Sequence, residues 1–372
     1  MKLVLTIIRY FVGILFIFSG LVKANDPLGL SYKMQEFFEV WGLHGLSDYT
    51  LVFSILMIAF EIIAGVAVII GWKMRLFSWL LLLLMIFFTF LTAYAVFSGK
   101  IKECGCFGDC IPLSALQSFW KDVILLILII VLFINRHKIE SRISTRWALI
   151  SLGLTIAFSF KLMGHVMTHL PIVDCLPYKK GNNLVEQMSI PPGAIPDSTV
   201  ITFVYNMNGQ KLEFTADNFP DDFDEDVYQF VDRYDKVVRK GNATPKIRDF
   251  ILADYSGTDL TYELLEKDRY QVYVFLKDEL KPGKWQDELK AFNTYLDGQQ
   301  IEKYLVSNLS ETEAQKVAAQ YFPGYQLLRS DATAIKTAAR VNPSILLVKK
   351  GTVLDKQSIN DIETMTENIK KY

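Results

Sequence analysis

The chain has 372 residues, a formal net charge of −1 and 51% hydrophobic residues. Its length predicts two or three domains, and its near-zero charge argues against a nucleic-acid partner, which normally needs a basic face. The composition changes near residue 170. Leu, Ile, Phe and Val dominate the earlier part, whereas the later part has the charged, mixed composition of a soluble domain.

Five runs in the first part are long and apolar enough to cross a bilayer, which takes about 20 residues per helix. We place them at residues 3–22, 50–70, 76–97, 119–134 and 147–167. The first run lacks the small-residue cleavage pattern of a signal peptide, so we expect it to remain as a helix. Residues 32–41 mix aromatic and charged side chains. They predict an amphipathic helix, either lying on the outer face of the membrane or packed on the bundle or the soluble domain.

Because successive spans alternate in direction, the N-terminus, the loop after the second span and the loop after the fourth span must lie on the same side of the membrane. All three segments are basic. They carry Lys2, Lys73, Arg75, Arg136, Lys138, Arg142 and Arg146, whereas on the other side acidic residues offset the loop lysines Lys23, Lys33, Lys100 and Lys102. Because cytoplasmic loops carry an excess of Lys and Arg, we predict a cytoplasmic N-terminus and an external C-terminal domain. The expected location is the bacterial inner membrane, with five transmembrane helices and the C-terminal domain in the periplasm, where disulfides can form and persist.

The predicted spans contain ionisable residues, among them Arg9, Glu61 and Lys161. Charges in hydrocarbon are costly and usually face partners inside a bundle. One interpretation is a proton or quinone site formed by Glu61 with Lys161 or Arg9. The other is a structural ion pair, or a Lys161 side chain that reaches the outer interface. No cofactor is certain, and a quinone is one candidate. A haem has less support, because His165 and His169 together offer at most one ligand face.

The four cysteines lie near the ends of predicted spans, with Cys104, Cys106 and Cys110 in one short polar loop and Cys175 just after the fifth run. A disulfide between Cys104 and Cys106 would close a small, strained ring, and strained exposed disulfides tend to be the labile, catalytic ones. Gly105 supplies the backbone freedom for such a turn. We therefore consider Cys104 and Cys106 as a catalytic exchange pair.

Other interpretations of the cysteines remain open. Cys110 and Cys175 could form a structural disulfide or act as resolving thiols, or all four cysteines could pair as structural staples. The cysteines could also stay free and simply pack. A metal site has little support, because the spacing lacks two Cys-x-x-Cys knuckles.

Several short motifs resemble the DoxX and MauE membrane families. Gly20-Leu21-Val22-Lys23 with Asp26-Pro27 looks like the opening of DoxX-type proteins, and Glu61 followed by Gly65 resembles their second helix. Cys104-Gly105-Cys106-Phe107-Gly108 looks like the MauE motif, which is associated with methylamine utilisation. The resemblance covers about residues 5–135 and implies a four-helix, redox-associated membrane core.

MauE-like proteins are thought to assist disulfide formation in a periplasmic amine dehydrogenase. This chain departs from that pattern by its fifth helix, its large C-terminal domain, and Cys110 and Cys175. The whole arrangement looks like DoxX-family proteins of Bacteroidetes-type bacteria.

The predicted organisation is a membrane domain at residues 1–135, a loop and fifth helix at 136–170, a connector at 171–245 and an α/β domain at 246–372. Turn residues Asn208-Gly209 predict a hairpin between strands at 199–205 and 211–214. The acidic run at 221–226 is expected to be a solvated face, and no metal site is predicted. The last domain alternates strands and helices. The strands are expected at 247–254, 270–276, 303–306, 325–328, 344–348 and 352–354, and the helices at 259–266, 284–296, 311–321, 332–339 and 359–370.

This succession resembles a thioredoxin-like fold. Residues 270–276 would precede the active-site turn, and Pro343 would match the position that is usually a cis proline. Where Cys-x-x-Cys would sit, the chain reads Lys277-Asp278-Glu279-Leu280. The domain therefore cannot exchange dithiols with its own residues, and we expect it to bind or position a partner.

The sequence supports two main functions. The first is thiol–disulfide exchange through Cys104 and Cys106 on the periplasmic face, which would mature envelope proteins, with a periplasmic client docked by the C-terminal domain. The second is a non-catalytic structural or assembly subunit of an envelope complex, in which the disulfides are structural. No hydrolase or nucleotide-binding motif is evident.

Overall fold

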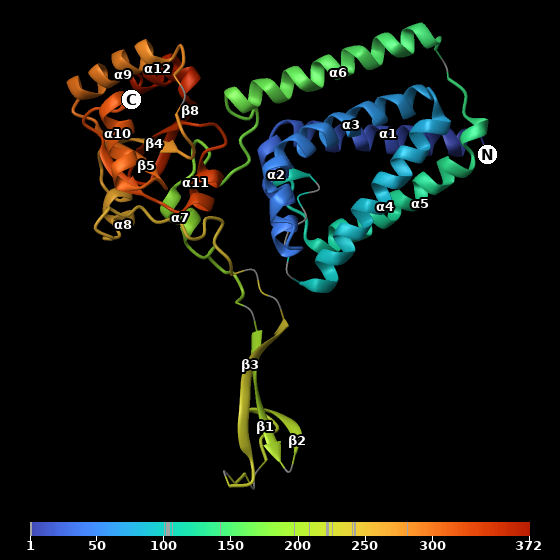
Figure 1. The fold of residues 1–372 in the computed structure, drawn as a ribbon, viewed down its shortest axis with the longest axis horizontal. Coiled ribbons are helices and arrows are strands. Elements are labelled where there is room, and N and C mark those ends of the chain that lie inside the picture. Colours follow the sequence, from blue (N-terminus) through green and yellow to red (C-terminus); the bar gives the residue numbers. More distant parts are fainter. Residues whose placement is uncertain are drawn as a thin grey trace.

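The computed structural model describes residues 2–99, 101, 105, 107–141, 143–196, 198–207, 209–220, 223–224, 226–239, 241, 243–280 and 282–372. It consists of a helical bundle, a mixed α/β domain and a small three-stranded sheet (Figure 1). The fold class predicted from the sequence, a membrane bundle followed by a thioredoxin-like α/β domain, is confirmed.

Within the described residues, five helices are long and apolar enough to cross a membrane, and they match the five predicted runs. The spans are Lys2–Ala24, His44–Ile70, Met74–Ser98, Ala115–Ile134 and Thr145–Thr168. They contain helices α1 (Lys2–Ala24), α3 (Thr50–Ile70), α4 (Met74–Ser98), α5 (Ala115–Ile134) and α6 (Thr145–Thr168). The chain is therefore a membrane protein.

Helices α1, α3, α4 and α5 form the bundle core, with buried residues that include Val12, Val68, Leu81 and Ile129. Glycines let α1 and α3 approach closely: a Cβ added to Gly65 would lie 2.7 Å from the carbonyl oxygen of Gly13. Small residues serve this purpose in membrane helix pairs. Helix α6 lies along α3 on the outside of this core (Figure 1).

Helix α2 (Pro27–Val40) lies across one end of the bundle. Asp26 caps it by accepting a hydrogen bond from the Gly29 amide at 3.0 Å, and Ser54 of α3 donates to the Pro27 carbonyl oxygen at 2.7 Å. Its buried Phe37 contacts Trp41, which in turn packs edge-on against Tyr94. Of the two predicted placements, the helix thus takes the one packed on the bundle. The short 3-10 helix η2 (Gly108–Cys110) lies at the same end, which we call the cysteine-loop end.

The predicted hairpin is present in the three-stranded sheet, which projects away from the rest of the molecule (Figure 1). Strand β1 (Ser198–Met207) pairs with β2 (Gln210–Thr215) and, on its other side, with β3 (Gln229–Arg239). The sequence analysis missed β3. The acidic run at 221–226 falls partly outside the described residues, and no metal-ligand cluster occurs among those described.

The α/β domain has a five-stranded sheet in the order β6-β5-β4-β7-β8. Strands β4, β5 and β6 are parallel, whereas β7 and β8 are antiparallel to their neighbours. The strands are β4 (Tyr270–Leu276), β5 (Glu302–Ser307), β6 (Gln326–Arg329), β7 (Ser344–Lys349) and β8 (Thr352–Ser358). The helices are α7 (Leu184–Met188), α8 (Thr261–Leu265), α9 (Gln286–Gly298), α10 (Glu311–Tyr321), α11 (Ala332–Ala338) and α12 (Ile362–Ile369), with a 3-10 turn, η4 (Ile359–Asp361), before α12.

A parallel β-α-β unit next to an antiparallel β-β-α unit is the thioredoxin-like arrangement that the sequence predicted. The central strand β4 is buried on both faces, as its continuous apolar pattern indicates. The Asn342-Pro343 peptide bond is cis, as predicted. One predicted strand is wrong. Residues 247–254 form only isolated bridges, in which Ala253 meets Asp259 and Arg329. Leu252 donates its amide to the Thr261 side chain instead of to a neighbouring strand.

Candidate functional site

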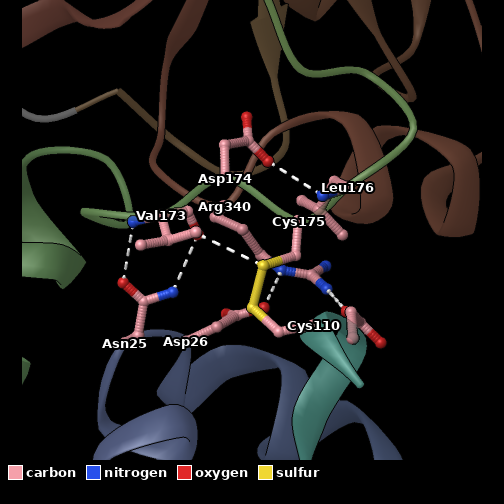
Figure 2. The surroundings of a disulfide bond; sticks show 9 residues. Asn25, Asp26, Cys110, Val173, Asp174, Cys175, Leu176 and Arg340 are labelled. Atoms are coloured by element: carbon pink, nitrogen blue, oxygen red, sulfur yellow. Dashed lines mark hydrogen bonds and ion pairs between the residues drawn. A yellow bond between two sulfur atoms is a disulfide. The ribbon is translucent and has the colours of Figure 1, made fainter. Parts of the chain in front are cut away.

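A disulfide joins the cysteine-loop end of the bundle to the segment that enters the α/β domain. Cys110 of η2 bonds to Cys175, which follows α6, with 4.8 Å between their Cα atoms (Figure 2). The two residues are 65 apart in the sequence, and closing a loop of that length lowers the entropy of the unfolded chain enough to stabilise by about 4 kcal/mol. Beside it, Asn25 and Val173 exchange two hydrogen bonds of 2.9 and 3.0 Å.

Arg340, just after α11, connects the α/β domain to two carboxylates of the bundle. Its Nε lies 2.7 Å from Asp26 Oδ2 and its Nη2 lies 2.5 Å from Asp109 Oδ2 (Figure 2). The guanidinium is almost fully buried. Burial lowers the pKa of Arg340, but the two carboxylates more than offset this effect, so its pKa is raised above the ordinary value. Arg340 is therefore held as a permanent cation between the two domains.

The edge of the α/β domain that faces the bundle is where a thioredoxin-like protein carries its active site. Lys277 follows β4 directly, and its amide donates to Asn342 Oδ1 at 2.9 Å, next to the cis proline. Its Nζ lies 3.4 Å from the hydroxyl of Tyr32 on α2. Burial lowers the pKa of Lys277 to about 8 and raises the pKa of Tyr32 to about 12. This edge, which lacks Cys-x-x-Cys, packs on α2.

A second group of contacts lies at the end of α6. Lys356 of β8 is buried and pairs with Asp174 at 2.8 Å. Burial is the main cause that lowers the pKa of Lys356, and Asp174 opposes it. His169 Nδ1 lies 2.8 Å from Asp361 Oδ1. With the disulfide and Arg340, these contacts fix the α/β domain on the cysteine-loop end of the bundle.

The predicted exchange pair, Cys104 and Cys106, lies outside the described residues, but Gly105 between them is described. Gly105 has φ +64°, a left-handed conformation that favours glycine. It packs against α2: a Cβ at this position would lie 2.9 Å from Lys33 Cγ. Its carbonyl oxygen accepts a hydrogen bond from the Gly108 amide at 3.0 Å. The Cys-Gly-Cys segment therefore meets α2 at its glycine.

The predicted partners of Glu61 are wrong. Glu61 is buried in α3 and binds Lys23 of α1, whose Nζ lies 2.6 and 2.8 Å from its two carboxylate oxygens. Ser19 donates to the same carboxylate at 3.2 Å. Lys161 is exposed on α6. Arg9 is buried in α1, and its Nε and Nη2 have no hydrogen-bond partner within the described part of the chain.

The sequence analysis also missed Asp122 and misjudged Lys23. Asp122 is fully buried in α5, with Lys121 Nζ 2.7 Å from its Oδ1 and Thr92 Oγ1 3.2 Å from its Oδ2. A carboxylate beside a lysine within an apolar run was a signal that could have been read. Lys23 was counted as a loop charge, although it lies one helical turn after Ser19 and thus on the same face of α1.

These two ion pairs and Gly105 line one cavity of about 590 Å³ in the bundle. Helices α1, α3, α4 and α5 form its walls, and α2 covers it at the cysteine-loop end. Apart from the ion pairs, Lys33, Ser19 and Thr92, its lining is apolar or aromatic. The cysteine motif therefore adjoins an apolar chamber that contains buried acids and bases.

The comparisons with known proteins agree with this architecture. A family model described as methylamine utilisation protein MauE matches residues 1–135, and a second, described as a domain of unknown function (DUF8463), matches residues 199–240. Protein TlpB of Flavobacterium psychrophilum is 28% identical over 165 residues, which cover 43% of this chain and 44% of that relative. The chain thus matches less than half the length of TlpB.

A solved structure, described as the identification of a disulfide switch in BsSco, a member of the Sco family of cytochrome c oxidase assembly proteins, has 16% identity and a TM-score of 0.25. The overlap covers 33% of this chain and 91% of that one. The family match spans the bundle core, and the sheet order defines the second domain. Residues 1–135 of this membrane protein are thus similar to the MauE family, and its C-terminal domain has a thioredoxin-like fold.

Proposed function

We propose that this membrane protein performs thiol–disulfide exchange through Cys104 and Cys106, and that the exchange serves the maturation of envelope proteins. The site would lie on the periplasmic face of a bacterial inner membrane. The exchange itself moves two electrons: client thiols lose two protons and two electrons as their disulfide forms, and the disulfide of Cys104 and Cys106 is reduced to two thiols.

One observation carries the proposal. The disulfide between Cys110 and Cys175 uses two of the four cysteines in the sequence and holds the two domains together. Cys104 and Cys106 are thereby left as the remaining pair, and the glycine between them lines a chamber with buried acids and bases. The four cysteines thus divide into a structural pair and a pair available for exchange.

The proposed orientation has support from the ends of the helices. Cys110 and Cys175 follow α4 and α6, and their bond requires both of these helix ends to lie on the same side of the membrane. The basic residues Lys73, Arg75, Arg136 and Lys138 belong to connections at the opposite helix ends. The excess of Lys and Arg in cytoplasmic loops assigns that opposite side to the cytoplasm. A reporter fused after Tyr372 should then be active only if it is a periplasmic type.

The thioredoxin-like domain has a positioning role in this proposal. Its usual active-site edge contains Lys277 and no cysteine, and Arg340 and Lys277 hold this side of the domain on the bundle. A client protein would therefore meet another surface of the domain and reach the cysteine loop beside it. Recognition and chemistry would thus lie in different domains.

The alternative is a structural or assembly subunit of an envelope complex. The bond between Cys110 and Cys175 favours it, because this disulfide connects domains that Arg340 also joins. Under this alternative, Cys104 and Cys106 would stay in a single oxidation state.

Trapping the thiols in living cells distinguishes these functions. Cells expressing the full chain are quenched with acid, and free thiols are alkylated with a maleimide that changes the electrophoretic mobility. We expect Cys104 and Cys106 in both oxidised and reduced forms, in a ratio that changes when dithiothreitol is added and removed. The matched variants are Cys104→Ser/Cys106→Ser and Cys110→Ser/Cys175→Ser. The first should abolish oxidation of a dithiol peptide by the purified protein, and the second should preserve it. A Cys104–Cys106 pair that never changes state would refute the exchange function.

A further inference from the structure

The cavity in the bundle lies close to the cysteine-loop end, near the ends of three of its helices. Lys23 is at the end of α1, Thr92 is near the end of α4, and Asp122 is in the second turn of α5. Gly105 and Lys33 close the chamber from the side of the cysteine motif. Its volume of about 590 Å³ lies within the range of roughly 300–1,000 Å³ for pockets that enclose organic ligands.

The inner wall of the cavity offers hydrogen-bond donors and acceptors that are shielded from water. Glu61 and Asp122 are at most 1% exposed, and each is paired with a lysine at 2.6–2.7 Å. A lysine ammonium has three donors, and Lys23 donates to both carboxylate oxygens of Glu61, which leaves one donor for a ligand. Lys23 also lies over the Phe88 ring, with 5.2 Å from Nζ to the ring centroid. This wall can hold a ligand with carbonyl oxygens and can exchange protons with it.

The outer wall of the cavity faces the lipid. Phe53 and Leu56 of α3 and Phe87 of α4 line the chamber and are also exposed on the bundle surface, Leu56 by 55%. In a membrane, that surface contacts acyl chains. A ligand can therefore enter between α3 and α4 from the hydrocarbon region, and an attached isoprenoid tail can remain in the lipid.

We propose that this cavity binds the headgroup of a membrane quinone, which accepts the electrons of the cysteine pair. This inference rests on the proposed exchange function. In the step, the two S–H bonds of reduced Cys104 and Cys106 break and one S–S bond forms. Two electrons and two protons pass to the quinone, whose two carbonyl oxygens become the hydroxyls of a hydroquinone. Lys23 hydrogen-bonds one of the carbonyl oxygens, and Glu61 and Asp122 act in proton transfer.

Binding can be measured without any redox turnover. The full-length protein in phosphatidylcholine nanodiscs is titrated with decylubiquinone, and an azido-naphthoquinone photolabel is mapped by mass spectrometry. We expect saturable binding, with label on peptides from α3 and α4 that line the cavity. Trp41 also lines the cavity, so its fluorescence should be quenched, and the quenching should decrease in Trp41→Phe.

Matched variants locate the ligand. Lys23→Met/Glu61→Leu removes one ion pair without leaving a buried charge, and should weaken binding about tenfold through the lost charge-assisted hydrogen bond. Leu56→Trp should obstruct the lipid-side entrance. Leu154→Trp is its control, because Leu154 is exposed on α6 and does not line the cavity. The control should bind decylubiquinone within about twofold of the unmodified protein, as expected of a distant site.

Three outcomes would overturn the assignment. They are an equal loss of affinity in Leu56→Trp and Leu154→Trp, label spread over lipid-facing helices without saturation, and displacement of the quinone by an equal concentration of oleate. The last would identify a site for an acyl chain.

A further variant separates this inference from the proposed function. Cys104→Ser/Cys106→Ser should bind decylubiquinone as the unmodified protein does. Normal quinone binding without thiol cycling would refute the exchange function and leave the cavity assignment standing. Thiol cycling without saturable quinone binding would refute the cavity assignment alone.

Discussion

Replacing Arg340 tests how the thioredoxin-like domain is held on the bundle. Arg340→Leu keeps an apolar side chain in place and removes the cation between Asp26 and Asp109. Removing one partner of a buried ion pair costs about 3–5 kcal/mol. Because the Asp109 side chain is 36% exposed, solvent weakens its interaction with Arg340. We therefore take the lower limit of about 3 kcal/mol for the contacts of Arg340 with Asp26 and Asp109 together. Local opening of the interface should then increase roughly a hundredfold.

Amide hydrogen exchange of the full chain in nanodiscs measures this opening. The probes are the Gly29 amide, which is bonded to Asp26, and the Ala339 amide, which is bonded to Ile335 beside Arg340. Both should exchange much faster in Arg340→Leu, whereas amides of β4 should not change. The disulfide keeps the domains tethered, so the change reports local opening rather than dissociation.

A matched control and a double-mutant cycle make the result decisive. Arg329→Leu replaces an arginine that is exposed on β6, and it should leave both probes unchanged. Asp26→Ala should be less than additive with Arg340→Leu, because the two substitutions remove the same contact. If Arg340→Leu leaves the exchange of the Gly29 and Ala339 amides at the unmodified rate, the reasoning about this interface is wrong.

Three more predictions follow from the same region. Cys110→Ser/Cys175→Ser should lose about 4 kcal/mol of stability in urea unfolding of the solubilised protein, and a loss no larger than for an exposed Ser substitution would contradict the structural assignment. Lys277 has its pKa lowered to about 8 by burial, so above that pH the unfolded state binds more protons and stability should rise between about pH 8 and 10. Thermal unfolding of Lys277→Met should lack this rise, and an identical pH profile would count against the assignment. Gly105→Ala should cost about 1–2 kcal/mol because of its positive φ, and Lys33→Ala should recover the part that comes from steric contact. Chemical denaturation of the single and double variants measures the cost of the backbone conformation and the cost of the steric contact separately.

The sequence was informative wherever one physical effect dominated. Long apolar runs located all five candidate spans, because hydrocarbon tolerates few other patterns. The strand expected at residues 270–276 is apolar on both faces, which is the pattern of a buried central strand. The serine at 310, followed three residues later by a glutamate, gives a capping box at the start of α10. These signals are local, and local signals can be read from one sequence.

The missed features depend on partners that are distant in the chain. Strand β3 is polar and mostly exposed, and it is a strand because β1 offers an open edge for pairing. Residues 247–254 looked like a strand from their apolar residues, but only Ala253 pairs with the edge strand β6, through Arg329. Glu61 was recognised as a buried charge. Its partner Lys23 could not be identified, because several lysines and arginines were equally consistent with the pattern.

The site was predictable in residue type and unpredictable in arrangement. The sequence identified the four cysteines and the absence of Cys-x-x-Cys in the second domain. It could not show that this domain turns its usual active-site edge toward α2, because Arg340 lies hundreds of residues from both Asp26 and Asp109. Such contacts are determined by tertiary packing alone.

Each cysteine of the interdomain disulfide directly follows an aspartate in the chain. Asp109 precedes Cys110 and binds Arg340, and Asp174 precedes Cys175 and binds Lys356. The covalent bond therefore holds two carboxylates in place as receptors for two buried cations of the α/β domain, which is synthesised after both cysteines. Both cysteines leave the ribosome before residues 340 and 356 exist, so the bond can close first. The α/β domain then folds against Asp109 and Asp174 when the disulfide already holds them close together. The entropy cost of closing that loop therefore does not fall on the docking of the domain.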